Sequence, residues 1–430
     1  MTLIADHAQR YQLANELHAR PFPFHSAPGM VAFLALKEPE NAAQRDRSGD
    51  RENLIELLDR FGAPHPKEDA THYFSDLGRF KLKWEAHTEF VTYTIFLNNL
   101  SEKPFDGICF DAFPKDWLES LSSLRITSVN LRLETMSDQE NSSEIISKKL
   151  ANWFVPESLA VSKVLDGSAV VASDFRIDEV GHQRFVLFVD PLTDERRVGR
   201  IIQRLCEIEM YKSMSMLGFA RVRSMARQMG NIDTKLSHIM SDMNDGKVAA
   251  EVTLDNLLKV STELETLSAA ASFRLGATEA YEAIVHQRIR VLREERFKGR
   301  QTFSEFMMRR YDPAMRTVKS SRVRLGNLAD RAIRAGDLLR TRVDVERSAQ
   351  NQALLTSMDK RADLQLRLQK TVEGLSVVAI SYYAVSLVSY LLYPLAENYS
   401  VTEGFLTSII TLPVVGLVYL LIRRIRSKML

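Results

Sequence analysis

Cysteine and proline are scarce in this chain of 430 residues, and both absences limit what the protein can be. Only Cys109 and Cys206 are present. They are too few for a disulfide framework and have no CxxC spacing, so we expect buried thiols in a reducing compartment. No N-terminal signal peptide is visible, because the first ten residues are already polar and charged, and the bulk of the chain is predicted to be cytoplasmic. Between Thr193 and Glu373 the only proline is Pro313, which leaves room for long helices.

Motifs for catalysis, nucleotide binding and metal binding are also missing. The sequence has no HxH, HExxH, GxGxxG, GxxxxGK[ST] or GxSxG, and His25, His65 and His72 lack the spacing of metal ligands. Serine, histidine and aspartate occur, but nothing places them together. The chain is therefore predicted not to be an enzyme and to need no cofactor, while binding of a divalent cation is left open.

The net charge of +2 hides an uneven distribution. Residues 1–285 hold 32 Lys and Arg against 42 Asp and Glu, whereas residues 286–347 hold 17 against 8. A basic block can mark nucleic-acid binding, but here the charges recur among apolar positions and acidic partners, without interleaved aromatic residues. A solvated or subunit-facing helix surface is the favoured interpretation, and nucleic acid is not expected as a partner.

Residues 1–192 are predicted to form a cytoplasmic α+β domain, because short strand-like and helix-like runs alternate. The strand candidates are Val31–Lys37, the hairpin Arg79–Asn98, Arg125–Thr135 and the strand–turn–strand segment Ser168–Asp190. Arg51–Gly62 has the apolar spacing of a helix. An antiparallel or mixed sheet with flanking helices follows.

Residues 193–373 are predicted to form a long all-α stalk with coiled-coil packing, since their apolar period is helical throughout. Three helices are expected at roughly 193–242, 249–299 and 303–373, with breaks near Asn244–Gly246 and Lys298-Gly299. The last helix should kink at Pro313. The sixty residues beyond that kink would span about 90 Å.

Residues 374–422 are predicted to form a two-helix transmembrane hairpin, because apolar runs at 374–395 and 404–422 are joined by only eight residues. Basic residues flank only the outer ends, and residues 423–430 form a basic tail. The connecting loop carries Glu397, Asn398 and Glu403 but no Lys or Arg. By the positive-inside rule, both termini are predicted to lie on the cytoplasmic side of a bacterial inner membrane, with the lipid bilayer as a partner.

The first apolar run, GLSVVAISYYAVSLVSYLLYPL, contains four tyrosines and four serines. At 100° per residue, four hydroxyl-bearing residues fall within an arc of about 60°: Tyr382, Ser386, Ser389 and Tyr393. The opposite face is apolar and consists of Val377, Ala384, Val388 and Leu391. A lipid-facing helix has no reason to gather hydroxyls, so this stripe should face other helices or water. Helix packing is slightly favoured, and a conduit lining at a symmetric oligomer axis is the alternative.

The segment NELHARP contains residue types that catalyse reactions in other proteins: Asn15, Glu16, His18 and Arg20. At helical spacing Glu16 and Arg20 are four residues apart, whereas His18 lies on a different side, and the prolines that follow end the helix. A helix end leading into the next strand is favoured over a site, and the role of this motif stays open.

Two resemblances bear on function. LANELHARPFP, the long helical middle and GLSVVAISYYAVSLVSYLLYPL resemble, over essentially the whole chain, a bacterial family of uncharacterised membrane-anchored proteins. That resemblance implies membrane location. The order of parts resembles the CorA-type magnesium channel family, which implies a homo-oligomer, a pentamer, with the first span lining a pore. The Gly-Met-Asn signature of that family is missing here, and Pro394–Tyr399 takes its place.

Two functions of different classes follow. One is an oligomeric inner-membrane cation conduit that is gated by the cytoplasmic domain, whose acidic front would bind divalent ions. The other is a membrane-tethered scaffold or sensor in which the hairpin only anchors and oligomerises. The hydroxyl stripe and the loop without Lys or Arg favour the conduit, and the missing signature favours the anchor.

Overall fold

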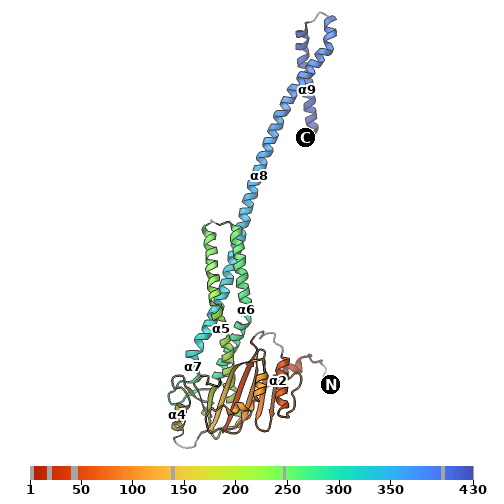
Figure 1. The fold of residues 1–430 in the computed structure, drawn as a ribbon. Coiled ribbons are helices and arrows are strands. Elements are labelled where there is room, and N and C mark those ends of the chain that lie inside the picture. The colour runs from red at the N-terminus through yellow and green to blue at the C-terminus, as the bar shows by residue number, and fades with distance from the viewer. Residues whose placement is uncertain are drawn as a thin grey trace. The chain divides into compact units, whose positions relative to one another are not determined.

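The computed structural model describes residues 4–16, 22–39, 47–136, 141–245, 248–398 and 402–429. The chain divides into two compact units. The first comprises Met1–Lys247 and Asp255–Ala335, and the second comprises Val248–Leu254 and Gly336–Leu430. The first unit holds a β-sheet with the helices packed on it, whereas the described part of the second unit is helical (Figure 1).

The described residues form a nine-stranded mixed sheet in the order β2-β3-β4-β1-β5-β8-β7-β6-β9. The strands are β1 (Gly29–Lys37), β2 (His72–Asp76), β3 (Lys81–Ala86), β4 (Val91–Leu97), β5 (Leu124–Thr135), β6 (Ala160–Val164), β7 (Ala169–Ser173), β8 (Gln183–Val189) and β9 (Glu295–Arg296). Neighbouring strands are antiparallel except for the parallel pair β5 and β8. The predicted sheet is therefore confirmed, and β2, β6 and β9 are additions to the predicted strands.

Long helices follow the sheet strands, as the sequence predicted. The helices are α1 (Arg10–Glu16), α2 (Ser48–Asp59), the 3₁₀ helix η1 (Ile108–Ala112), α3 (Lys115–Ser120), α4 (Ser142–Trp153), α5 (Glu195–Asp245), α6 (Ala250–Arg290), α7 (Phe303–Arg310), α8 (Asp312–Asn398) and α9 (Glu403–Met429). The mixed α/β class with long helices and a C-terminal apolar helix is thus confirmed.

Helix α2 covers one face of the sheet. Side chains alternate between the two faces of a strand, so one set of residues from β1, β3 and β4 points towards α2. Leu54 and Leu57 of α2 pack there against a core that includes Trp84, Tyr93 and Trp117. Burial of this many large apolar groups is the main stabilising contribution in this half of the sheet.

Helix α4 covers the same face further along. The thiol of Cys109 contacts Asn130 of β5 at 3.4 Å, and Lys149 of α4 pairs with Glu134 of β5. Asn130 and Glu134 are an even number of residues apart, so they point to the same side of the strand. The core under α4, which includes Leu150, therefore continues the layer that α2 begins.

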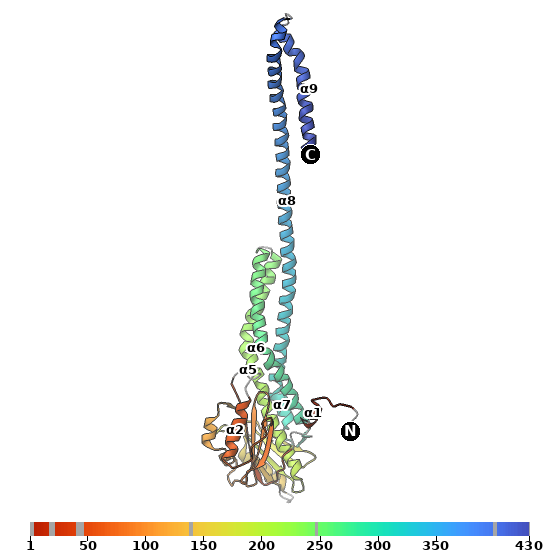
Figure 2. The ribbon, with the colours of Figure 1, turned by 90° about the vertical axis from the view of Figure 1, so that its right-hand side faces the viewer.

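Helices α5 and α7 cover the opposite face (Figure 2). Thr127 of β5, which has the other parity, lies 3.4 Å from Glu209 of α5. Phe185 of β8 packs edge-on against Phe303 of α7, with ring centroids 6.0 Å apart. The first unit therefore has three layers: α2 and α4, the sheet, and the helices α5 and α7.

Ion pairs join the helices of the first unit beyond the sheet. Asp233 of α5 pairs with Arg324 and Arg331 of α8 at 3.0 and 2.6 Å, and Lys235 of α5 pairs with Glu263 of α6 at 2.8 Å. The apolar positions Ile232, Leu236, Leu264 and Leu267 are buried between these helices, as their helical spacing predicts.

Two predicted details of the helices are wrong. The chain does not kink at Pro313: α7 ends at Arg310 and α8 begins at Asp312, so the proline lies in the first turn of a new helix, where its missing N–H is not needed. The second long helix does not run to residue 299 either. It ends at Arg290, because Glu295–Arg296 leave the helix to pair with Ser162 and Lys163 at the edge of the sheet.

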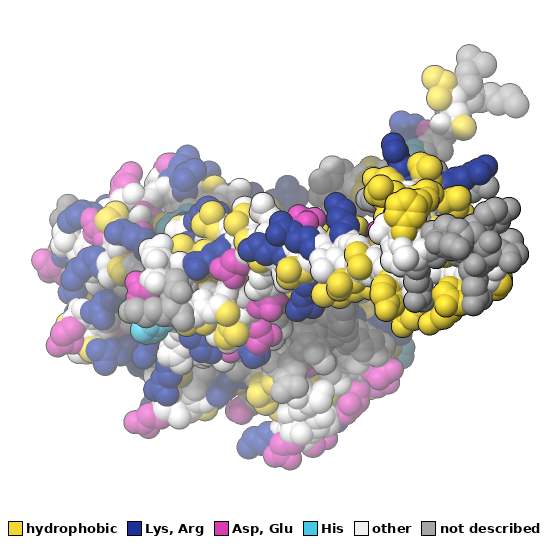
Figure 3. All heavy atoms as spheres, turned by 90° about the horizontal axis from the view of Figure 1, so that it is seen from above, with side chains coloured by type: hydrophobic (Ala, Val, Ile, Leu, Met, Phe, Trp, Pro, Cys, Tyr) yellow, Lys and Arg dark blue, Asp and Glu magenta, His cyan; other side chains and the backbone are white. Residues whose placement is uncertain are grey.

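In the second unit, two helices are long and apolar enough to cross a membrane. They are the part of α8 within Asp312–Pro394 and the segment Gly404–Ile425 of α9, and little of either apolar window is buried. Exposed apolar side chains cover both windows. Figure 3 shows hydrophobic side chains gathered in one broad yellow area, whereas blue and magenta charged groups are mixed over most of the remaining surface.

Candidate functional site

The predicted hydroxyl stripe borders a groove between α8 and α9 with a volume of about 620 Å³. Tyr382, Ser386, Ser389 and Tyr393 all line it. Further hydroxyls come from Ser381 and Tyr390 of α8 and from Thr407 and Thr411 of α9. The structure thus brings the four predicted residues together and adds hydroxyls from the second apolar helix.

Two serine hydroxyls in this groove differ from their neighbours in their hydrogen bonds. Ser376, Ser408 and Thr411 each donate to the carbonyl oxygen four residues earlier in their own helix, at 2.7–2.8 Å. The buried oxygens of Ser381 and Ser389 have no hydrogen-bond partner within the described part of the chain. Because an unpaired hydroxyl in an apolar medium costs free energy, these two oxygens call for a partner.

The apolar face opposite the stripe is only partly as predicted. Leu391 is 68 % exposed, as expected for a lipid-facing residue. Val377 instead lines the groove, and Ala384 and Val388 are half-buried. These residues lie opposite the stripe on an isolated α8, but α9 covers part of that face.

The predicted connecting loop is shorter than expected. Helix α8 continues through Glu397 to Asn398, and α9 starts at Glu403, so these three residues lie in helical turns and not in an open loop. Their side chains are outside the described residues. In the NELHARP motif, Asn15 and Glu16 end α1, while their side chains, and the whole of His18 and Arg20, also lie outside the described residues.

A second site, which the sequence did not indicate, is a cavity of about 310 Å³ on the α5 side of the sheet. We call it the charged cavity. The hairpin β3–β4 provides Lys83, Glu85, His87, Thr92 and Thr94, α5 provides Arg204, Glu207 and Cys206, and α6 provides Arg288. Its apolar walls include Phe22, Phe33, Phe96 and Met210. The cavity thus combines an apolar body with several charged groups, as ligand pockets do.

Most charges of the cavity are paired. Lys83 lies 3.1 Å from Glu85 and also donates to Gln203 at 3.1 Å. Arg288 pairs with Glu207, which in turn accepts a hydrogen bond of 2.8 Å from Gln203. These contacts connect the sheet, α5 and α6 through polar groups.

Arg204 is the exception among the charges of the cavity. Its Nη1 donates to the carbonyl oxygen of Val291 at 3.0 Å, and no carboxylate within the described ranges lies at ion-pair distance. Burial, followed by the neighbouring charges of Arg200 and Arg288, lowers the pKa of the Arg204 guanidinium. Guanidinium groups stay protonated in proteins, so the cavity holds an excess of positive charge at this residue.

The start of the chain closes one side of the charged cavity. Phe22 and Pro23, the last two residues of LANELHARPFP, belong to the cavity wall. Pro23 passes so close to α5 that a Cβ added to Gly199 would lie 1.6 Å from its carbonyl oxygen. Only glycine permits this approach of the two backbones.

His25 follows this crossing, is buried, and has no oppositely charged partner among the described residues. Its ring packs against Phe96 at a centroid distance of 5.5 Å, and neither ring nitrogen has a hydrogen-bond partner within the described residues. Burial, assisted by the positive charge of Lys81, lowers the pKa of His25 from its ordinary 6.5 to about 4. The imidazole is therefore neutral at pH 7.

The tip of the β3–β4 hairpin is fastened to α6 by Glu89. This carboxylate is 1 % exposed, accepts from Arg274 at 2.5 Å and accepts from the hydroxyl of Tyr281 at 2.7 Å. Burial, and then the hydrogen bond to Glu89, raise the pKa of Tyr281. The contact fixes the hairpin that contributes six residues to the wall of the charged cavity.

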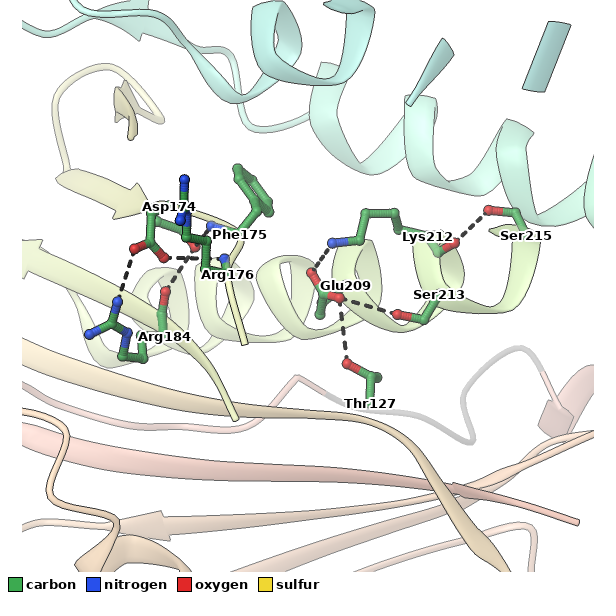
Figure 4. Close-up of polar contacts among 10 residues, drawn as sticks. Thr127, Asp174, Phe175, Arg176, Arg184, Glu209, Lys212, Ser213 and Ser215 are labelled. Carbon is green, nitrogen blue, oxygen red and sulfur yellow. Dashed lines mark hydrogen bonds and ion pairs between the residues drawn. The ribbon is translucent and has the colours of Figure 1, made fainter. Parts of the chain in front are cut away.

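Two buried carboxylates outside the lining of the charged cavity are engaged in structural contacts (Figure 4). Glu209 of α5 lies 2.6 Å from Lys212 and accepts from Ser213 and Thr127. Asp174 pairs with Arg184 at 2.9 Å and accepts from two backbone N–H groups. Their lone pairs are occupied by these donors, so both groups serve to hold α5 and the β7–β8 connection on the sheet.

The cysteines and the acidic residues show no reactive or metal-binding arrangement in the described ranges. Cys109 and Cys206 are free and buried, and burial raises the pKa of both thiols, that of Cys109 to about 12. The thiolate, which is the reactive form, is therefore scarce at neutral pH. No cluster of three or more His, Cys, Asp or Glu suited to a metal ion is found in residues 4–429 outside the undescribed gaps.

One signal for the charged cavity was present in the sequence. Along KLKWEA and VTYTIFL, polar residues alternate with apolar ones, which normally indicates one solvated face. Here Lys83, Thr92 and Thr94 are buried instead, because α5 and α6 cover that face. Only the arrangement of later helices distinguishes a solvated polar face from a cavity.

The fold and these sites define a mixed α/β protein with two helices apolar enough to cross a membrane. The chain belongs to the family described as "Protein of unknown function (DUF3422)", whose model matches residues 5–429. This agrees with the whole-chain resemblance stated above. No curated protein and no solved structure matches the chain, and the resemblance in layout to the CorA-type family is not supported.

Proposed function

We propose that the protein is a membrane-tethered sensor or scaffold whose hairpin α8–α9 anchors the chain and associates with the hairpins of further copies. The observation that carries this proposal is the groove in which Ser381 and Ser389 bury oxygens without a partner among the described residues. In membranes, the usual partners of such hydroxyls are polar groups on neighbouring helices. A second copy of the chain provides such a helix.

Insertion into a bacterial inner membrane with both termini in the cytoplasm is part of this proposal. It is supported by the two apolar helices, by Arg423 and Arg424 after the second, and by the lack of Lys and Arg between residues 396 and 403. A reporter enzyme fused after Leu430 is expected to be active only in its cytoplasmic form. Periplasmic activity would overturn this topology. The proposal assigns the chain no catalytic reaction and no nucleic-acid partner.

A cation conduit is the second candidate function, and the same groove favours it. Hydroxyls from α8 and α9 would line a wet path if several copies placed their grooves around one axis. The acidic residues Glu397 and Glu403, with no cation between them, would attract cations to its outer mouth. This candidate needs water in the groove, whereas the anchor needs a protein partner there.

Single cysteines distinguish the two candidates. Ser389→Cys places a thiol in the groove, and Leu391→Cys places the matched control on the exposed face of the same helix. The native Cys109 and Cys206 are buried and contribute little background. For an anchor, Ser389→Cys should form a disulfide between copies in native membranes and resist a small water-soluble thiol reagent, whereas Leu391→Cys should do neither.

Other outcomes favour the conduit or exclude both candidates. Modification of Ser389→Cys but not of Leu391→Cys by the water-soluble reagent would favour the conduit over the anchor. A protein that stays monomeric in mild detergent and forms no disulfide through Ser386→Cys or Ser389→Cys would exclude both, since each requires several copies.

A further inference from the structure

We propose that the charged cavity binds a small phosphate monoester, with the phosphate beside Arg204 and an apolar or aromatic body against Phe33 and Phe96. This goes beyond the proposed function, because it assigns a ligand site to the sheet and the helices packed on it, which we call the sheet domain. It does not depend on how the hairpins associate.

The charges of the cavity favour an anion. Three cationic side chains line it, Lys83, Arg204 and Arg288, against the two carboxylates Glu85 and Glu207. Each carboxylate is engaged by a cation, which leaves Arg204 as the cation without a carboxylate among the described residues. Arginine offers several N–H donors in one plane, a geometry that suits phosphate oxygens.

Groups around Arg204 add to this positive potential. Arg200, Arg288 and Arg293 all act on its guanidinium as like charges, and only Glu207 acts in the opposite direction. Such repulsion is relieved when a dianion binds, and a dianion relieves it more than a monoanion does. The site therefore favours a phosphate over a single carboxylate.

The remaining walls set the size and character of the ligand. Phe33 and Phe96 come from the sheet, Met210 from α5 and Phe22 from the segment that precedes β1. The volume of about 310 Å³ lies at the lower end for ligand pockets, which fits a compact molecule with one ring.

Stability alone does not explain these charges. The other side of the same hairpin buries Leu82, Trp84, Tyr93 and Ile95 in a hydrophobic cluster, without ion pairs between the described residues of these strands. Buried ion pairs are often no more stabilising than well-packed apolar residues of similar volume. A cavity lined by charges between two helices and a sheet is therefore better explained by a polar ligand than by folding.

Binding is tested on the full chain in detergent micelles by titration calorimetry with phenyl phosphate. We expect saturable binding, with benzoate binding more weakly and phenol showing no saturation. Arg204→Gln should lower the affinity for phenyl phosphate about tenfold to hundredfold, because a charge-assisted hydrogen bond is lost. Arg227→Gln is the matched control: the same change on an exposed residue of the same helix, about 35 Å away.

A second variant covers the case that Arg204→Gln does not fold. Glu207→Gln removes a negative charge from the cavity wall, so it should raise the affinity for phenyl phosphate several-fold. The proposal is wrong if phenyl phosphate shows no saturable binding up to about 10 mM. It is equally wrong if benzoate or phenol binds as tightly as phenyl phosphate, or if Arg204→Gln and Arg227→Gln have equal affinities. Failure of this experiment leaves the cross-linking result of the hairpin unaffected.

Discussion

The charged cavity of the sheet domain and the groove between α8 and α9 are both polar sites in apolar surroundings, but they use different groups. The cavity is lined by charged Lys, Arg and Glu side chains, whereas the groove is lined by apolar residues and by serine, threonine and tyrosine hydroxyls, with no charged side chain among its lining residues. A charge at the centre of a bilayer costs several kcal/mol, and a hydroxyl can be satisfied by its own helix. The difference is the one expected if the groove lies in a bilayer, as proposed, and the cavity does not.

The comparison also shows where each site is incomplete. In the cavity, Arg204 lacks a carboxylate, and in the groove, Ser381 and Ser389 lack any partner among the described residues. A buried cation without a carboxylate favours the binding of an anion. A buried hydroxyl without a partner favours a hydrogen bond to water or to a polar group on another helix. Contacts in the sheet domain should therefore depend on charge, whereas contacts in the groove should not.

The largest effect is expected at Glu89, at the tip of the hairpin that carries the cavity. Glu89→Ala removes the carboxylate that pairs with Arg274 and leaves the buried Arg274 charge without it. The free energy of unfolding should therefore fall by about 3–5 kcal/mol. The three tryptophans, Trp84, Trp117 and Trp153, all lie in the sheet domain, so their fluorescence during denaturation in micelles measures this change. Glu263→Ala, which removes an exposed ion pair, should cost no more than about 1 kcal/mol. Equal losses in both variants would contradict a buried charge contact.

His25 should make the stability of the sheet domain depend on pH. Its pKa is about 4 when folded and about 6.5 when unfolded, so only the unfolded chain binds a proton between these values. The contribution of the neutral ring is complete above pH 6.5 and is lost as the pH falls towards 4, by about 3 kcal/mol in all. His25→Phe should flatten this part of the stability curve, whereas His238→Phe, at an exposed position, should not. An unchanged slope in His25→Phe would show that another group titrates.

Gly199 tests whether the start of the chain belongs to the cavity. Gly199→Ala forces the backbone of Pro23 away from α5 and should cost about 1–3 kcal/mol of stability. Gly230→Ala is the matched control on the same helix, where nothing lies within 4 Å, and it should stabilise by about 0.5–1 kcal/mol. Thermal unfolding followed by tryptophan fluorescence gives both values, and effects of the same sign would contradict the close crossing.

The smallest effect is expected in the groove. Ser389→Ala removes one hydroxyl and should weaken the association of hairpins by roughly 0.6–2 kcal/mol, independently of pH between 5 and 8. Measurement of the monomer fraction against the protein-to-detergent ratio gives this value. Leu391→Ala, on the exposed face, should leave association unchanged. A pH-dependent loss in Ser389→Ala would break the contrast with the sheet domain.

Much of the fold was predictable because its signals are local. Apolar and polar residues alternate along β4 and β5, β1 is a continuous apolar run, and α2 has helical spacing, so these elements were expected close to where they lie. The arc of Tyr382, Ser386, Ser389 and Tyr393 was predictable for the same reason, since one helix determines it. Thr407 and Thr411 join that groove only because α9 packs beside α8, which no pattern in α8 indicates.

The remaining features depend on segments that are far apart in the sequence. β9 has two residues, too few for a pattern, and is a strand only because β6 offers an unpaired edge. The polar side of the β3–β4 hairpin looks the same whether water or α5 covers it. Pro313 is compatible with either a kink inside a helix or the start of a helix. Because α7 ends at Arg310 and α8 begins at Asp312, the proline lies at a helix start.

The pairing of β9 with β6 has a consequence for synthesis of the chain. The edge of β6 at Ser162 is covered only after Arg296 has been synthesised. At ordinary translation rates this takes on the order of 10 s. During that interval the growing chain exposes an unpaired strand edge together with the sheet face that α5 and α7 later cover. A nascent chain of about 190 residues therefore carries an exposed strand edge, a feature that favours pairing with other chains. The sheet completes its last edge only after α5 and α6 have been synthesised, and before α8 and α9.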